Sequence, residues 1–348
     1  MTESPSSRLA EPLLDVRDLH TSFPIRSGLL RRTTGEVQAV AGVSIALHEG
    51  ETLGLVGESG CGKSTLARTL VGLNRASAGS VTFGGRDVLR LAGAERRAFR
   101  RDVQMVFQDP FASLNPRMTV GELVTEAWEV HPGLVARGDR EAELHRLLRQ
   151  VGLDPAAATR YPHQFSGGQR QRISIARALA VRPRLLICDE AVSALDVSIQ
   201  GQILNLLTQL QRDLGIAYLF ISHDLAVIRH ISDRVAVMYL GRIVETGTRA
   251  EVFDRPRHPY TQALLSAAPV VRPWEHEGRV VLPLEGDLPS PADPPTGCRF
   301  RTRCPRAEER CSVEEPTLVV RGDHPSACHF AVDPGPKVLA EARVGRLR

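Results

Sequence analysis

The sequence predicts an α/β protein with a mostly parallel β-sheet, preceded by an antiparallel β region and followed by a small cysteine-containing extension. Short apolar runs of strand length recur at Thr52–Val56, Arg184–Cys188 and Ala217–Ser222, and segments with helical periodicity separate them. A strand, a helix and a second strand in this order imply a right-handed crossover, and therefore parallel pairing. A chain of 348 residues has room for one large domain and an appendage.

The N-terminal elements are indicated by alternating apolar residues and by turn residues. A turn at Glu49-Gly50 precedes the apolar run at Thr52–Val56, and a hairpin turns at Gly84-Gly85. From these patterns we expect strands at Leu14–Phe23 and Val37–Leu47, a helix at Ser64–Leu73, and the hairpin over Ser80–Val88.

From about residue 110 to residue 182 the pattern becomes helical, which predicts a helical subdomain inserted in the sheet domain. Glu141–Val151 and Ile199–Leu214 each carry apolar residues on one helical face. Val235–Tyr239 and Arg242–Glu245 read as a closing hairpin around Gly241.

Composition shifts after Arg255, where proline becomes frequent and Pro269–Pro295 reads as loop. We therefore predict a flexible N-terminus at 1–11, a main domain at 12–255, a C-terminal extension at 256–333 and a flexible tail at 334–348.

Charge and hydropathy exclude several classes of function. The net charge is only +4 and the arginines are spread along the chain, so no basic tract indicates nucleic-acid binding. An apolar run of about 18 residues, as a membrane span needs, is missing, and Met1–Pro12 lacks the apolar core of a signal peptide. We expect the chain to stay in the cytosol, and any transport pore to belong to other chains.

A glycine-rich loop follows the apolar run at Thr52–Val56 and precedes a predicted helix. It fits the phosphate-binding pattern G-x-x-x-x-G-K-[ST], in which glycines let backbone N–H groups point at an anion. A purely structural turn is the alternative, but Lys-Ser after the last glycine disfavours it. Lys63 is expected to reach the β- and γ-phosphates of ATP, and Ser64 to ligate Mg²⁺. The predicted nucleotide-binding residues of this loop are Gly57, Glu58, Ser59, Gly60, Cys61, Gly62, Lys63, Ser64 and Thr65.

Two acidic residues end the apolar strand predicted at Leu185–Glu190. A buried strand that ends in Asp189 and Glu190 suggests a cation, whereas an acidic surface loop is the alternative. Asp189 suits Mg²⁺ and Glu190 suits polarising the attacking water. His223 ends the following strand at the same sheet edge, where it can meet the γ-phosphate instead of serving structure alone.

A second candidate anion site lies at Ser166-Gly167-Gly168-Gln169, just before a helical segment. Ser166 and Gln169 have capping-box spacing, and two glycines at a helix N-terminus expose N–H groups. Two phosphate-binding helix ends in one chain suggest a dimer in which each protomer contributes one end to its partner's ATP.

With these motifs in order, residues 13–250 resemble the ATP-binding subunits of ABC transporters, which are P-loop NTPases. The phosphate loop matches Walker A, Leu185–Glu190 matches Walker B, and Ser166–Gln169 matches the signature motif. The resemblance further implies a Q-loop at Gln108, a D-loop at Asp196 and a switch histidine at His223. It makes Glu190, His223, Lys63 and Gln108 catalytic, and Ser64, Gln108 and Asp189 the Mg²⁺ ligands.

Two positions fit that pattern less well. Ala191 stands where the family usually has proline, which would loosen the turn without removing activity. Phe23 is the candidate for the aromatic residue that stacks on adenine, and a core phenylalanine is the alternative.

A narrower resemblance is to the dipeptide/oligopeptide importer ATPases, and in particular to the F-type subunit. It is carried by Val106–Pro110, Ser113–Arg117, Ala194–Gln200, Met238–Gly241 and His258–Thr261. It implies a D-type ATPase partner, two transmembrane permease subunits and an extracytoplasmic solute-binding protein, at the cytoplasmic face of the membrane. The branch also includes transporters for nickel and other solutes, so the solute stays open. ABC proteins of DNA repair or of ribosomes are disfavoured, because the chain has a single cassette without long insertions.

Four cysteines, Cys298, Cys304, Cys311 and Cys328, lie close together in sequence. In a reducing cytosol such a group indicates a metal site more than disulfides, although the intervals match neither zinc ribbons nor ferredoxins. Nearby Arg299, Arg301, Arg303 and Arg306 would favour thiolates. The resemblance implies a [4Fe–4S] cluster; zinc, with His324 or His329 as further ligands, and free thiols are the alternatives.

Overall fold

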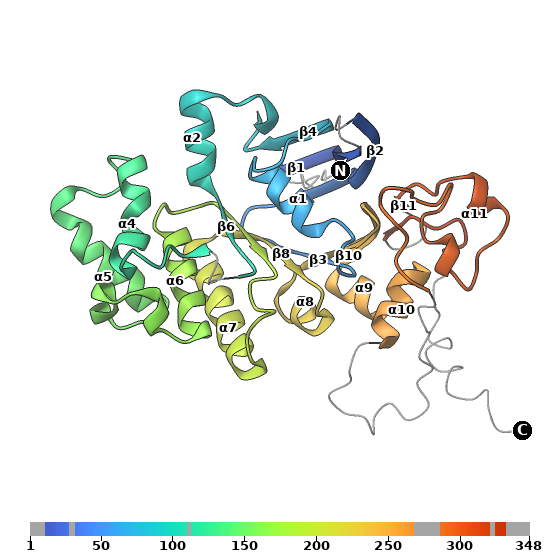
Figure 1. Cartoon of the computed structure of the whole chain (residues 1–348). Helices are drawn as coiled ribbons and strands as arrows, with labels where there is room; N and C mark the ends of the chain where they lie inside the picture. The colour runs from blue at the N-terminus through green and yellow to red at the C-terminus, as the bar shows by residue number, and fades with distance from the viewer. Residues whose placement is uncertain (1–10, 28–31, 110–112, 268–285, 321–323, 332–348) are drawn as a thin grey trace, which may run out of the picture.

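The computed structural model describes residues 11–27, 32–109, 113–267, 286–320 and 324–331 (Figure 1). The predicted flexible tail and almost all of the predicted flexible N-terminus lie outside these residues, as does much of the predicted Pro269–Pro295 loop. Among the described residues, no helix is both long and apolar enough to cross a lipid bilayer.

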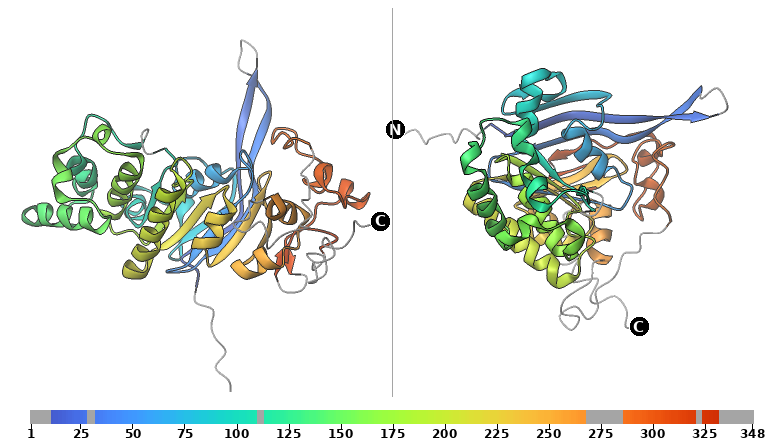
Figure 2. Two further views of the ribbon diagram at one scale, coloured as in Figure 1. Left: turned by 90° about the horizontal axis from the view of Figure 1, so that it is seen from below. Right: turned by 60° about the vertical axis from the view of Figure 1, so that its left-hand side comes forward.

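The N-terminal strands form an antiparallel sheet, as predicted. Its strand order is β2-β1-β4-β5, and the hairpin of β1 and β2 projects well beyond the rest of the molecule (Figure 2). The β4–β5 hairpin turns at Gly84 and Gly85, both of which have positive φ. The strands are β1 (Leu14–Ser27), β2 (Arg32–Leu47), β4 (Ala78–Phe83) and β5 (Arg86–Asp87).

A second sheet of eight strands forms the centre, in the order β11-β12-β10-β9-β3-β8-β7-β6. From β9 to β6 neighbouring strands are parallel, which confirms the predicted crossovers, whereas β10, β12 and β11 are antiparallel. The strands are β3 (Thr52–Val56), β6 (Val103–Val106), β7 (Leu185–Asp189), β8 (Ala217–Ser222), β9 (Arg234–Tyr239), β10 (Arg242–Thr248), β11 (Val319–Val320) and β12 (Pro325–Ser326).

Helices cover the sheet and build the predicted helical region at one end (Figure 1). There α4 and α6 pack together, and the fully buried Trp128 of α4 donates its indole N–H to the Ala180 carbonyl at 2.9 Å. The helices are α1 (Lys63–Leu70), α2 (Gly93–Asp102), α4 (Val120–Val130), α5 (Arg140–Gln150), α6 (Gly167–Leu179), α7 (Val197–Leu214), α8 (Leu225–Ile231), α9 (Arg249–Asp254), α10 (Pro259–Ala267) and α11 (Arg310–Val313).

Both faces of the central sheet are buried, which explains why its strands read as continuous apolar runs. On β7, Leu185 and Ile187 face the antiparallel sheet and α1, whereas Leu186 and Cys188 face the helices of the other side. Cys188 is fully buried and packs in the core on this second side.

Helix α2 and strand β6 are among the elements that the sequence analysis did not predict, and both lack a strong hydrophobic pattern. Helix α2 buries only Phe99, because its sequence is dominated by charged side chains. Strand β6 has four residues, two of them only partly buried. Short or polar segments of this kind form because neighbouring elements support them, not because of their own periodicity.

The C-terminal extension continues the central sheet. Strand β12 pairs with β10 through Ser326 and Glu245, and β11 pairs with β12. In Figure 1 this region lies at the end of the molecule opposite to α4 and α5. The predicted boundary near residue 255 therefore falls within a continuous packed body, and the division into domains stays a prediction.

Candidate active site

Four neighbouring strands of the central sheet carry candidate catalytic residues at their carboxyl ends. In the order β3-β8-β7-β6, these ends lead to the phosphate loop, His223, Glu190 and Gln108. Ligands of open α/β sheets bind at this edge. Residues far apart in sequence are thus brought together in one row by strand order.

The phosphate loop joins β3 to α1 and takes a conformation that requires glycine. Gly60 and Gly62 have φ of 81° and 109°. A Cβ atom at Gly62 would lie 2.0 Å from the Ala39 carbonyl oxygen, so the loop packs directly against β2. Glycine is therefore required at this position for close packing against β2 as well as for phosphate binding.

Lys63 lies at the centre of this loop and is almost fully buried. Its ammonium donates to the carbonyl oxygens of Gly57 at 2.7 Å and Glu58 at 2.9 Å. The Cys61 sulfur lies 3.7 Å away, and burial raises the pKa of this thiol. Cys61 is therefore a small buried side chain in its protonated form, as expected for a position without redox function.

Asp189 and Ser64 meet next to this lysine. The Ser64 hydroxyl donates to the Asp189 carboxylate at 2.8 Å. Burial raises the pKa of the Asp189 carboxyl above its usual range, and the hydrogen bond from Ser64 acts in the opposite direction. A buried carboxylate and a hydroxyl beside a phosphate loop suit Mg²⁺, which takes few protein ligands and completes its shell with phosphate and water oxygens.

Glu190 is held on both sides by the other two candidates. Gln108 donates its amide N–H to one carboxylate oxygen at 2.8 Å, and His223 Nδ1 lies 3.3 Å from the other. Glu190 has a φ of 48°, an unfavourable conformation for a residue with a side chain. Its N–H donates to the Ile221 carbonyl at 3.0 Å, so the backbone of β8 stabilises this conformation.

The turn after Glu190 is well supported although Ala191 replaces the usual proline. Ala191 is buried, and the Glu190 carbonyl accepts hydrogen bonds from both the N–H and the hydroxyl of Ser193. Hydrogen bonds thus constrain this turn where a proline ring would otherwise restrict it, and the predicted loosening stays a prediction.

The signature loop caps helix α6 as its sequence predicts. Ser166 accepts from the Gln169 N–H at 3.3 Å, and Gln169 accepts from the Ser166 N–H at 3.0 Å, which completes the capping box. A Cβ atom at Gly168 would lie 2.5 Å from the Ile199 side chain. Asp196 and Val197, at the start of α7, are exposed, and the Val197 side chain is 84% exposed.

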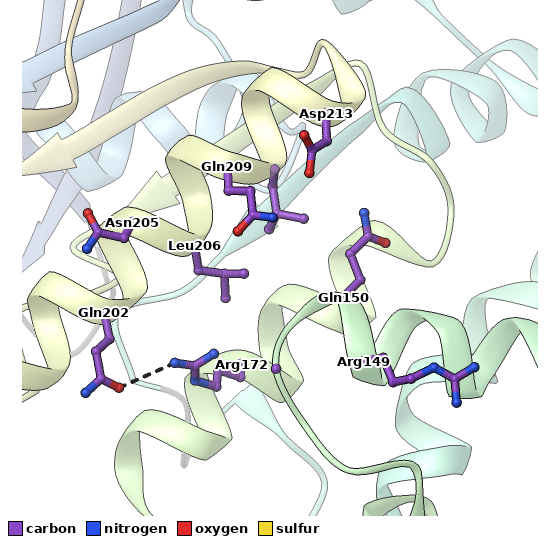
Figure 3. Close-up of a pocket in the computed structure, with 10 residues that line it drawn as sticks. Arg149, Gln150, Arg172, Gln202, Asn205, Leu206, Gln209 and Asp213 are labelled. Carbon is purple, nitrogen blue, oxygen red and sulfur yellow. Dashed lines mark hydrogen bonds between the residues drawn. The ribbon is translucent and has the colours of Figure 1, made fainter.

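Arg172 connects helix α6 to the neighbouring helices by hydrogen bonds. Its guanidinium donates to the Val151 carbonyl, after α5, at 2.7 Å and to the Gln202 side chain of α7 at 3.4 Å (Figure 3). A cavity of about 540 Å³ lies between these three helices, separate from the phosphate loop. These bonds join the signature helix to both the helical region and the sheet domain.

The structure leaves one candidate open. Phe23 lies on β1 opposite Val37, and its side chain is 41% exposed. It is therefore not a core phenylalanine, and its predicted contact with adenine stays a prediction.

The four C-terminal cysteines lie close enough together for their charges to interact, but in this arrangement they are not spaced as ligands of a metal ion. The pKa of the Cys298 thiol is raised to about 11, mainly by burial and to a smaller extent by the charges of Cys311, Cys304 and Cys328. All four are free of disulfides. Yet across the described residues, no three His, Cys, Asp or Glu side chains are close enough together to hold a metal ion. Of the two histidines of the zinc alternative, His324 Nε2 lies 2.7 Å from the Glu245 carboxylate and His329 Nε2 lies 3.0 Å from the Glu314 carbonyl oxygen.

The prediction that nearby arginines favour thiolates is wrong for three of the four. Arg299 donates to the Leu240 carbonyl, Arg301 to the Thr296 carbonyl and Arg303 to Glu58. Burial dominates instead, and the pKa values of Cys304 and Cys328 are raised, although Arg306 acts to lower both.

Sequence reasoning also missed a contact between this extension and the phosphate loop. The Glu58 N–H donates to the Tyr260 hydroxyl at 2.9 Å, and the Glu58 carboxylate accepts two hydrogen bonds from Arg303. No local pattern in the sequence could have indicated it, because the partners lie more than 200 positions apart.

Comparisons with known proteins agree with this geometry. The family described as "ABC transporter" matches residues 40–193, and that described as "Oligopeptide/dipeptide transporter, C-terminal region" matches residues 244–311. Among solved structures, the dimeric, ADP- and phosphate-bound form of the ATP-binding cassette MJ0796 is 26% identical. It has a TM-score of 0.60 and covers 68% of this chain and 98% of its own.

Relatives of similar length cover nearly the whole chain. The oligopeptide transport ATP-binding protein AppF of Bacillus subtilis is 53% identical, over 92% of this chain and 98% of its own length. OppF of Salmonella typhimurium, an oligopeptide transport ATP-binding protein, is 52% identical over 92% and 97%. The glutathione import ATP-binding protein GsiA of Pectobacterium atrosepticum is 57% identical over 81% of this chain and 45% of its own length. The chain is thus an ABC-type ATPase and belongs to the ATP-binding subunits of the dipeptide/oligopeptide ABC transporter family, in its F-type branch.

Proposed function

We propose that this chain powers the import of dipeptides and oligopeptides as one half of an ATPase heterodimer. Its partner is a D-type ATPase, and the pair sits on the cytoplasmic face of the membrane below two permease subunits, which receive solute from an extracytoplasmic binding protein. The observation that carries the proposal is the near-complete coverage of oligopeptide transport ATP-binding proteins at 51–53% identity.

Nucleotide binding is assigned to the phosphate loop. The backbone N–H groups of the phosphate loop other than that of Glu58, together with the Lys63 ammonium, contact the triphosphate, and Phe23 stacks on adenine. Ser64, Asp189 and Gln108 hold Mg²⁺, which neutralises charge that builds up on the phosphates. In support, Ser64 and Asp189 are already joined by a hydrogen bond at 2.8 Å.

Hydrolysis is assigned to Glu190, whose carboxylate orients the attacking water. Gln108 and His223 hold that carboxylate from two sides, and His223 and Lys63 stabilise the transferring phosphoryl group. The signature residues Ser166 to Gln169 and Asp196 act across the dimer, on the partner's nucleotide. Ser166, Gln169 and Asp196 are exposed at helix starts, which supports this role, as does the dimeric MJ0796 structure.

A second solute class has its own support. Relatives described as glutathione import ATP-binding proteins are 57–58% identical over 80–81% of this chain, so short peptides such as tripeptides are included among the candidates. Nickel and other small solutes stay as the alternative implied by the wider branch. The ATPase site itself is the same in each case, because the solute contacts other chains.

Uptake measurements separate these solutes. Cells that carry the chain and the membrane proteins copurified with it should take up labelled dipeptides and oligopeptides, and the Glu190→Gln variant should abolish this uptake. A pull-down of the chain from detergent-solubilised membranes should recover two integral membrane proteins and a second ATPase. Uptake of nickel alone, or a pull-down that yields no permease, would contradict the peptide importer, whereas uptake of glutathione alone would restrict the solutes to short peptides.

We further propose that the four C-terminal cysteines hold a [4Fe–4S] cluster. In support, none of the four cysteines forms a disulfide, and they lie close enough together for their charges to interact. Protein purified without oxygen should be brown and contain about four iron and four sulfide ions per chain. A matched Cys298→Ser variant should lose this iron, whereas Cys61→Ser should retain it. Stoichiometric zinc, or a colourless chain that takes up no iron on anaerobic reconstitution, would exclude the cluster.

A further inference from the structure

The C-terminal extension forms hydrogen bonds with one residue of the phosphate loop, Glu58. Both terminal nitrogens of Arg303 donate hydrogen bonds to the Glu58 carboxylate, at 2.6 Å and 3.1 Å, so the pair is bidentate. From the same side, the Tyr260 hydroxyl accepts the Glu58 backbone N–H at 2.9 Å. Glu58 directly follows Gly57, whose carbonyl holds the Lys63 ammonium.

The ion pair of Arg303 and Glu58 is partly shielded from water, which strengthens the attraction between the two charges. The Arg303 side chain is 6% exposed and the Glu58 side chain 26%. A bidentate pair in such a place contributes more than an exposed ion pair, because its charges are less screened. Glu58 also raises the pKa of the Arg303 guanidinium, so the arginine stays charged at all relevant pH values.

A packed aromatic cluster positions Arg303 and Tyr260. The rings of Tyr239, Tyr260 and Phe300 are fully buried and contact one another, with centroids 4.7 to 5.5 Å apart. Arg303 also lies near the Tyr239 ring, at 6.0 Å from its centroid. Its backbone N–H donates to the Phe300 carbonyl at 3.0 Å, so its position is tied to this cluster.

We propose that Arg303 and Tyr260 are positioning residues for ATP, and that they act through Glu58 to set the shape and charge of the phosphate loop. Arg303 neutralises an acidic side chain that would otherwise repel the phosphates. Tyr260 accepts a hydrogen bond from the backbone N–H of Glu58, so this N–H points at the extension. The extension thus contributes to nucleotide affinity although its own residues lie outside the binding motifs.

The kinetic consequence is specific. The loop contacts the phosphates in the bound state and in the transition state alike, so loosening it removes uniform binding. We therefore expect the KM for MgATP to rise and kcat at saturating ATP to stay within about twofold. A purely structural role of Arg303 would instead lower the temperature of unfolding and leave KM unchanged.

The test uses ATPase kinetics of the full chain together with the proteins that copurify with it. Arg303→Ala should raise the KM for MgATP about tenfold, as loss of a shielded, charge-assisted contact predicts. Arg303→Lys, which keeps the charge without the bidentate geometry, should give an intermediate KM. Arg301→Ala is the matched control, because Arg301 lies in the same turn but donates to Thr296 and should leave KM unchanged.

A double-mutant cycle checks that the effect passes through Glu58. In a Glu58→Gln background, Arg303→Ala should change KM by less than about threefold, because the repelling charge is already gone. Tyr260→Phe, which removes only the hydroxyl, should raise KM about threefold and keeps the test available if Arg303→Ala fails to fold. Equal KM values in Tyr260→Phe, Arg303→Lys and the parent chain would overturn the proposal, as would an effect of Arg303→Ala that is undiminished in the Glu58→Gln background.

Discussion

Replacing Glu190 with glutamine is expected to lower kcat for ATP hydrolysis by about a thousandfold while MgATP still binds. General-base assistance of this kind accounts for roughly a hundred- to ten-thousandfold in rate. The amide keeps the size of the carboxylate and one oxygen for Gln108, so the fold of the site should persist. Phosphate release gives kcat, and titration with a fluorescent nucleotide gives the dissociation constant, which should change less than about threefold.

Glu49→Gln serves as the matched control for this substitution. Glu49 is 68% exposed and pairs with Arg184 at the protein surface, so its loss of charge should leave turnover intact. If Glu190→Gln hydrolysed ATP at the parent rate, Glu190 would not be the residue that orients water. If it lost nucleotide binding as well, its role would be structural.

Lys63→Ala should weaken MgATP binding about a hundredfold, which is the second large effect. The lysine is 4% exposed and its ammonium lies where the β- and γ-phosphates are expected. Charge-assisted hydrogen bonds to phosphate are among the strongest single contacts, at about 1.5 to 3 kcal/mol each. Titration of the purified chain with MgATP measures the loss, and heat stabilisation by saturating nucleotide should fall with it.

Lys63→Arg separates the charge from the shape of this side chain. The planar guanidinium is larger than the ammonium that lies between the Gly57 and Glu58 carbonyls, so we expect it to restore little affinity. Parent-like binding by Lys63→Ala would mean that backbone N–H groups alone capture the triphosphate, and the assignment of Lys63 would fail.

Much of the fold could be predicted because the pattern and the packing agree. Strands β3 and β8 have the predicted bounds, since five- and six-residue apolar runs between glycines or polar turns leave little freedom. Helix α2 could not be predicted, because a helix with one buried side chain carries almost no periodic signal. The Ser166 capping box was correctly predicted, because its two hydrogen bonds are local.

The candidate site divides in the same way. Gly57 to Thr65, Asp189 and Glu190 are found from sequence because each motif lies on one strand end. The pairing of Gln108 with Glu190 needs the fold, since 82 positions separate the two residues and parallel strand order brings them together. The arginines near the cysteines were misjudged for the same reason, because proximity in sequence does not say which way a long side chain points.

By itself the sequence determined the class of the protein, its phosphate loop, its acidic strand end and its signature helix, because each depends on contacts within about ten residues. Only the tertiary structure decided that Arg303 and Tyr260 hold Glu58, that hydrogen bonds replace a proline after Glu190, and that burial governs the cysteine thiols. These features depend on long-range packing and on exclusion of water, and both arise when distant segments meet in the folded chain.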